Sequence, residues 1–262
     1  MIDLLKAEEE FKKYVNNYDL KNPHIERKVI HSYKVVEVAG IIAESLKLDE
    51  EDIKLAKLIA LLHDIGRFEQ LKRYGTYRDV DSIDHADFGV KLLFENGLIR
   101  KFVDDSKYDK IIFKAIKNHN KYKIEDGGCN KEELLHCKII RDADKTDIFR
   151  VHADDIIKKE NVLFDYEKIK EEKITDEIIN AFTNFKLVNS KKIKTDLDWY
   201  LKDIAFIFDF YFPKGIEIVN DNKYIDVMLK AIENDKNEDI SKELIFIKNK
   251  LNQFFNEKLE KK

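Results

Sequence analysis

The chain has 262 residues, of which 44% are apolar and 11% aromatic, so it can bury a sizeable core and is not disordered over most of its length. Eight glycines and two prolines are too few for a collagen-like or linker-rich protein. The 48 basic and 52 acidic residues give a net charge of −4. This balance argues against a nucleic-acid polymer as partner, because phosphate backbones require a basic excess.

Nothing in the sequence points to a membrane or to an oxidising compartment. The longest apolar runs are short and interrupted by charge, so we expect no membrane contact. No signal peptide is recognisable, and two cysteines, Cys129 and Cys137, are too few for a disulfide framework. We therefore expect a cytoplasmic protein, and the sequence leaves its oligomeric state open.

Apolar residues recur with helical spacing along almost the whole chain, and no long alternating run predicts a strand. Asp49 is the expected N-cap of one helix that ends before Gly66, and Asn130 with Glu133 resembles a capping box. In chain order, the expected helices cover roughly residues 4–18, 25–47, 50–65, 84–96, 106–119 and 130–155, with a loop over 67–81.

Further helical stripes follow around residues 178–185, 197–208 and 240–251, and Pro213 interrupts the run. The predicted fold class is all-α. All seven histidines lie between His24 and His152, so we expect the chemistry within a helical core at residues 1–155. Residues 156–262 are expected to form a C-terminal helical extension packed on the same bundle.

Six metal-ligand side chains are predicted to lie on otherwise apolar helix faces: His31, His63, Asp64, His85, His119 and Asp144. Asp144 is the most informative, because Ile140 and Ile148 flank it at four residues and an unpaired buried carboxylate is costly. Each histidine alone would more often be a hydrogen-bonded core residue, and Asp144 could form a core ion pair with Arg141 or Lys145.

Taken together, these side chains favour a metal site. Imidazole and carboxylate ligands suit Fe, Mn, Co, Ni or Zn. Four histidines and two aspartates exceed the needs of one ion, which indicates two metals that share a carboxylate.

The order His31, then His63-Asp64, then Asp144 resembles the HD-domain superfamily of metal-dependent phosphohydrolases. The segment LLHDIGR at 61–67 is similar to its HD signature, and IIRDADKTD at 139–147 is similar to its closing segment. His85 and His119 fall where dinuclear branches carry two further histidines. The resemblance covers about residues 25–155 and implies an HD-domain helical bundle extended by C-terminal helices.

The chain departs from the best-defined branches of that superfamily. Arg67 stands where the phosphodiesterase branch with a GYP segment has lysine, His119 is followed by Asn120 where that branch pairs two histidines, and no GYP segment is present. The mononuclear nucleotidase branch often has glutamate at the position of Arg67. The resemblance therefore does not identify one specific activity.

The resemblance implies that Asp64 bridges two divalent transition metals (Fe, Mn, Co or Ni). His31, His63 and Asp144 would complete one site, and His85 and His119 the other. A metal-bound hydroxide would then hydrolyse a small phosphorylated substrate, either nucleotide-like or another phosphate ester.

Basic residues are the candidates for the substrate phosphate. Arg67 is the strongest because it follows the ligands closely and can hold two phosphate oxygens. Lys72, Arg73 and Arg78 are either substrate-binding residues or a solvated loop. Lys145 either assists catalysis beside Asp144 or pairs with Asp147.

Two alternatives use the same scaffold. A di-iron oxygenase of this fold, acting on a polyol or a phosphonate, would need the same ligands. A catalytically silent regulatory module would lack ligands, and the sequence has all six.

Overall fold

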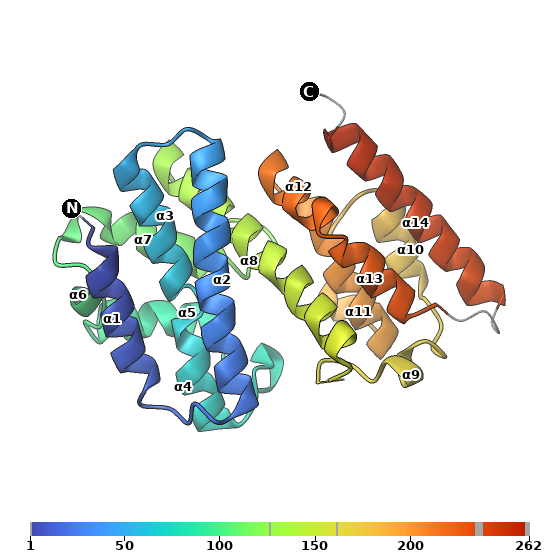
Figure 1. The fold of residues 1–262 in the computed structure, drawn as a ribbon, viewed down its shortest axis with the longest axis horizontal. Coiled ribbons are helices and arrows are strands. Elements are labelled where there is room, and N and C mark those ends of the chain that lie inside the picture. The colour runs from blue at the N-terminus through green and yellow to red at the C-terminus, as the bar shows by residue number, and fades with distance from the viewer. Residues whose placement is uncertain (1, 126, 161, 234–237, 260–262) are drawn as a thin grey trace. The chain divides into compact units, whose positions relative to one another are not determined.

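A computed structural model describes residues 2–125, 127–160, 162–233 and 238–259 (Figure 1). Within these ranges the chain is mostly helical and no residue lies in a strand, so the all-α prediction is confirmed. The chain divides into two compact units, Met1–Asp144 and Lys145–Lys262.

The first unit is a bundle in which α2 packs on α3, α4 packs on α5, and α5 packs on α7. Two short 3-10 turns (Asp79–Asp81 and Ser106–Tyr108) and a π turn (Lys91–Glu95) interrupt the α-helices. The α-helices are α1 (Leu4–Val15), α2 (Pro23–Ser45), α3 (Glu50–Leu62), α4 (Ile65–Tyr74), α5 (His85–Val90), α6 (Ile99–Phe102), α7 (Asp109–Asn118) and the start of α8 (Lys131–Lys158).

Several helices begin where the sequence predicts. The Asp49 carboxylate accepts a hydrogen bond from the backbone N–H of Asp52 at 2.9 Å and caps α3. The predicted capping box is confirmed: the Glu133 N–H donates to the Asn130 side chain at 2.8 Å, and the Asn130 N–H donates to the Glu133 carboxylate at 3.0 Å. Pro23 is the first residue of α2, where its missing N–H costs no hydrogen bond.

The loop predicted over 67–81 is wrong for its first half. Residues 65–74 form α4, and the chain turns earlier, at His63 and Asp64. Gly66 lies inside α4, and Gly75, at φ 68°, ends this helix in the left-handed conformation. The prediction failed because a glycine after an apolar helix is usually a C-cap, whereas Gly66 allows α4 and α5 to pack closely.

The second unit also consists of helices around its own apolar core. It contains the end of α8, α9 (Tyr166–Ile169), α10 (Asp176–Thr183), α11 (Asp196–Ile204), α12 (Pro213–Asp221), α13 (Tyr224–Ala231) and α14 (Glu238–Leu259). The expected interruption at Pro213 is the start of α12.

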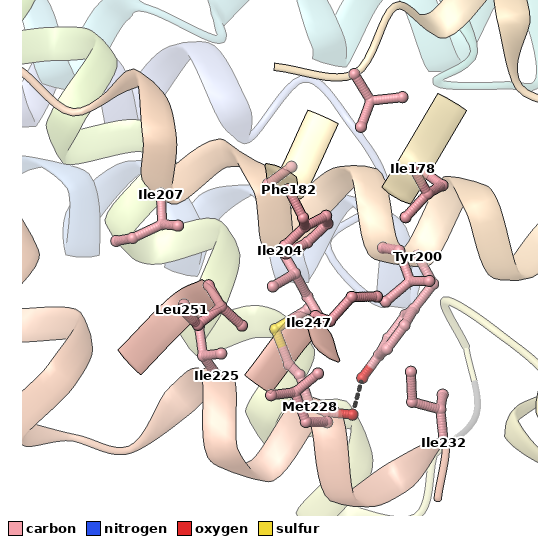
Figure 2. Close-up of a cluster of buried hydrophobic side chains, with 14 of the residues drawn as sticks. Ile178, Phe182, Tyr200, Ile204, Ile207, Ile225, Met228, Ile232, Ile247 and Leu251 are labelled. Atoms are coloured by element: carbon pink, nitrogen blue, oxygen red, sulfur yellow. Dashed lines mark hydrogen bonds between the residues drawn. The ribbon is translucent and has the colours of Figure 1, made fainter. Parts of the chain in front are cut away.

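Figure 2 shows part of this core, to which α10, α11, α13 and α14 contribute. Ile178 and Phe182, predicted to share a stripe, are both fully buried there. The buried Tyr200 hydroxyl donates to the Met228 carbonyl at 2.8 Å, so its polar atom is satisfied inside the cluster.

Candidate metal centre

The six predicted ligand side chains come together within the first unit. His31 comes from the middle of α2, His63 and Asp64 from the turn between α3 and α4, and His119 from the residue after α7. His85 opens α5, and Asp144 lies on α8. The four histidines and Asp64 are buried, whereas the Asp144 side chain remains 14% exposed.

The two oxygens of the Asp64 carboxylate face different partners. Oδ2 lies 3.7 Å from His31 Nε2 and 3.6 Å from His63 Nε2. Oδ1 lies 3.4 Å from His85 Nε2 and 3.6 Å from His119 Nε2. The Asp64 carboxylate therefore stands between two histidine pairs.

Asp144 completes the first of these groups. Its Oδ1 lies 3.1 Å from His31 Nε2 and 3.6 Å from His63 Nε2. The alternative partners considered for it are engaged elsewhere: Arg141 donates to backbone carbonyls, including those of Asn118 and His119.

Hydrogen bonds to the outer ring nitrogens fix the tautomers of three histidines. His63 Nδ1 donates to the Ala60 carbonyl at 2.7 Å, and His119 Nδ1 donates to the Ile116 carbonyl at 2.6 Å. His85 Nδ1 bonds the Asp79 carboxylate at 2.6 Å. Since carbonyl and ionised carboxylate oxygens only accept, each ring keeps its Nε2 lone pair for the cluster, the arrangement that metal-bound imidazoles use.

This donor set fits a cation. His85 Nε2 and His119 Nε2 approach to 3.0 Å, and with both rings protonated at Nδ1 two lone pairs would repel each other. His63 Nε2 is buried and has no hydrogen-bond partner. A shared positive ion removes both penalties, because buried polar atoms need partners.

The electrostatics favour the protonation states that a metal would require of the predicted ligands. Burial alone would raise the pKa of Asp64, but the charge of Lys28 helps to lower that pKa well below its usual range. Burial likewise opposes ionisation of Asp144, and the neighbouring His31 and His63 lower the pKa of this carboxyl well below its usual range. Burial lowers the pKa of His85 to about 4, so this imidazole is neutral near pH 7.

Gly66 lets α4 and α5 approach each other beside this cluster. A Cβ atom at Gly66 would lie only 2.4 Å from the His85 carbonyl oxygen and 2.8 Å from the Gly89 nitrogen. Glycine at this position therefore allows α5 to carry His85 up to Asp64.

Comparison with protein families agrees with this geometry. The family model described as HD domain matches residues 29–148, the segment that contains all six predicted ligands. Residues 29–148 form an HD domain. The recognition of the HD domain from its motifs is confirmed, and the dinuclear subtype stays a prediction. The HD domain indicates a hydrolase-type function that depends on divalent metal, and several His/Asp groups in the structure could hold one.

Other comparisons add no relatives. Neither the search of curated proteins nor the search of solved structures gave a match. Among the helices that the structure describes, none has the length and apolar character needed to cross a membrane.

Sequence reasoning missed two residues of the HD domain that contact the predicted ligands. Asp79 bonds His85 Nδ1 with one oxygen, and with the other it accepts from Arg67 at 2.9 Å and from Gln70 at 3.0 Å. Lys28 Nζ lies 2.6 Å from Asp64 Oδ2. Asp79 sits in a short 3-10 turn whose position no periodic pattern marks, whereas Lys28 precedes His31 by three residues, a helical spacing that could have been noticed.

Arg67 differs in its position from the other predicted phosphate-binding residues. Arg67 lies beside the predicted ligands, with its Nε 3.6 Å from Asp64 Oδ1 and its side chain 15% exposed. Arg73 pairs with Glu69, Arg78 pairs with Asp81, and both arginine side chains are more than half exposed. Lys72 lies over a tyrosine ring, 5.5 Å from its centroid.

Lys145 forms an ion pair with Asp209, at 2.7 Å, within the second unit. The carboxylate of Asp147, its predicted alternative partner, instead binds Arg150 at 2.5 Å.

Proposed function

We propose that this chain is a phosphohydrolase or phosphodiesterase that uses two divalent transition metals, Fe, Mn, Co or Ni, to hydrolyse a small phosphate ester. His31, His63 and Asp144 would hold one ion, His85 and His119 the other, and Asp64 both. The substrate is nucleotide-like or another small phosphorylated molecule. The HD domain at residues 29–148 supports the hydrolase class.

One observation carries the proposal of two ions. The oxygens of Asp64 divide between two groups of predicted ligands, and each oxygen lies 3.4–3.7 Å from two imidazole Nε2 atoms. A single ion needs only one of these groups to reach an ordinary coordination number. A bridging carboxylate accounts for both groups with one side chain.

Bound metals of this kind lower the pKa of a water and neutralise charge on a phosphoryl group. The protein's own contribution is placement. The Nδ1 hydrogen bonds of His63 and His119 to backbone carbonyls hold these rings in the ligating tautomer.

Arg67 is suited to orient the phosphate. One of its terminal nitrogens is fixed by Tyr77, Gln70 and Asp79, while its buried Nε has no hydrogen-bond partner. The guanidinium is already held in place, and its Nε–H beside Asp64 can still donate a hydrogen bond. An anion can therefore bind there without the entropic cost of ordering the side chain. The roles predicted for Lys72, Arg73, Arg78 and Lys145 remain predictions, as does the division at residues 155 and 156.

Metal content and activity test this function together. Wild-type protein reconstituted with Mn²⁺ should retain about two equivalents after desalting and hydrolyse p-nitrophenyl phosphate or its bis-ester. Asp64→Ala should lose both ions and the activity, whereas Asp81→Ala, which changes an exposed carboxylate, should keep both. A variant Asp64→Ala with wild-type metal content and turnover would contradict the proposal.

The same assay under nitrogen separates hydrolysis from the oxygenase alternative. Turnover without oxygen supports hydrolysis. Absence of turnover, together with oxygen-dependent consumption of a polyol or phosphonate by the iron-loaded protein, would replace it with oxygenase chemistry. Metal binding without any turnover on a broad library of phosphate esters would favour a silent regulatory module.

A further inference from the structure

A lysine occupies part of the ligand cluster. Lys28 Nζ lies 2.6 Å from Asp64 Oδ2, a distance typical of a strong charge-assisted hydrogen bond. The Lys28 side chain is 22% exposed, and Asp64 is the one carboxylate that it contacts among the described residues. The ammonium thus supplies positive charge to an otherwise buried anion.

The contact is made to one oxygen of the two. Oδ2 is the oxygen that faces His31 and His63, so the ammonium and an ion at the His31–His63–Asp144 group would need the same lone pairs. Two cations at one carboxylate oxygen repel each other strongly in a buried setting. An ion can fill this group only when the ammonium has left Oδ2.

Within the part of the chain that the structure describes, the other oxygen has no ammonium in contact with it. The guanidinium beside Oδ1 is that of Arg67, whose Nε lies 3.6 Å away. Its terminal nitrogen is held by the Tyr77 carbonyl and by Asp79, so Arg67 stays in place. An ion at His85 and His119 can therefore bind Oδ1 without displacing a hydrogen bond of Asp64.

Lys28, in contrast, can move. A lysine ammonium is a point charge on a flexible stem, and no second carboxylate holds this one. Its Nζ already lies 5.8 Å from the centroid of the Tyr77 ring, whose face attracts a cation. The ring, which the Arg67 guanidinium also approaches at 5.8 Å, therefore remains a partner for the ammonium after it leaves Oδ2.

We infer that Lys28 is a displaceable counter-ion of Asp64 that makes the two metal positions unequal: the His85–His119 position fills first, and the His31–His63–Asp144 position fills last and more weakly. This inference rests on the proposed function, because it presupposes two ions at Asp64. It assigns to Lys28 the control of metal loading.

Calorimetric titration with Mn²⁺ tests the inference without an activity assay. Wild-type protein should bind two ions in two resolved steps. Lys28→Met should tighten the weaker step by about tenfold or more and leave the stronger step nearly unchanged. Lys34→Met is the matched control, since it removes an exposed lysine from the same helix, and it should reproduce the wild-type titration.

Thermal unfolding adds a readout that a merely structural role would not give. Without metal, Lys28→Met should unfold at a lower temperature than wild type, because Asp64 loses its counter-charge. With saturating Mn²⁺ this difference in unfolding temperature should shrink or disappear, because the wild-type ammonium then no longer contacts Asp64. Lys28→Gln keeps a hydrogen-bond donor but removes the charge, and it should give the same results as Lys28→Met in both assays. It replaces Lys28→Met if that variant does not fold without metal.

The outcomes are distinguishable from failure of the proposed function. A wild-type protein that binds fewer than two Mn²⁺ ions would overturn the dinuclear proposal and this inference with it. Two ions in wild type with an unchanged weaker step in both Lys28 variants would overturn only the inference. The inference would also be overturned if the Lys28 variants lowered the unfolding temperature by the same amount with and without Mn²⁺.

Discussion

Replacing Gly66 with alanine should remove one metal ion and leave the other. The added Cβ would meet the His85 carbonyl oxygen at 2.4 Å and the Gly89 nitrogen at 2.8 Å. Both neighbours are backbone atoms, so no flexible side chain can move aside. To bring the Cβ and the His85 carbonyl oxygen to an ordinary contact distance of 3.4 Å, the facing backbone of α5 must move away by about 1 Å.

A displacement of this size matters because metal–imidazole bonds tolerate little error. They measure about 2.0–2.1 Å, and a working site keeps to within roughly 0.2 Å. His85 moves with α5 and should leave bonding range, whereas His31, His63 and Asp144 do not lie on this helix. Overpacking should cost about 1–3 kcal/mol of stability, partly offset by the better helix propensity of alanine.

The assay is metal content after reconstitution and desalting, with thermal unfolding alongside. Gly66→Ala should retain about one equivalent where wild type retains two. Gly89→Ala is the control from the opposite side of the same contact, because its Cβ would lie 3.5 Å from the Gly66 nitrogen, an ordinary distance. Two tightly bound ions in Gly66→Ala, or an equal loss in Gly89→Ala, would refute the reasoning.

Two further predictions concern groups that act through neighbours. Asp79→Asn should lower the affinity for one of the two proposed Mn²⁺ ions by about 10–100-fold in a titration, because His85 loses the carboxylate that orients it. The control Asp81→Asn changes an exposed carboxylate and should keep the wild-type affinity. Equal affinities in the two variants would refute this prediction. In the second unit, burial opposes ionisation of Asp203, but nearby charge and a hydrogen bond with His152 at 3.0 Å lower its pKa to about 2. Because the folded-state pKa lies below the unfolded value, this group stabilises the fold above about pH 4, and its contribution of about 2 kcal/mol disappears as the pH falls toward 2. Denaturant unfolding at pH 6 and pH 3 should show a smaller loss in Asp203→Asn than in wild type, and identical losses would contradict the assignment.

The helical pattern carried most of the fold information. Caps such as Asp49 and the Asn130–Glu133 box are local, so the residues that form them are adjacent in the sequence and readable from it. The stripe of Ile178 and Phe182 is likewise local and is buried as expected.

What the sequence did not reveal depends on contacts between distant segments. The sequence pattern predicts a helix end at Gly66, whereas in the structure this glycine allows the backbone of α5 to pack closely. That contact involves residues about twenty positions away, so no local pattern shows it. Asp79 reaches His85 from a short irregular turn, and Lys28 reaches Asp64 across 36 positions. The cluster of four histidines and two aspartates was predictable, because histidine and aspartate on apolar helix faces are conspicuous without knowledge of their partners; their role as metal ligands stays a prediction.

The proposal that Asp64 joins two ions can be tested most directly by anomalous diffraction from crystals of the Mn²⁺-loaded protein. The geometry predicts two peaks about 3.5–4 Å apart, one beside each oxygen of the Asp64 carboxylate, with His31 and His63 at the first and His85 and His119 at the second. A single peak, or peaks away from Asp64, would contradict it.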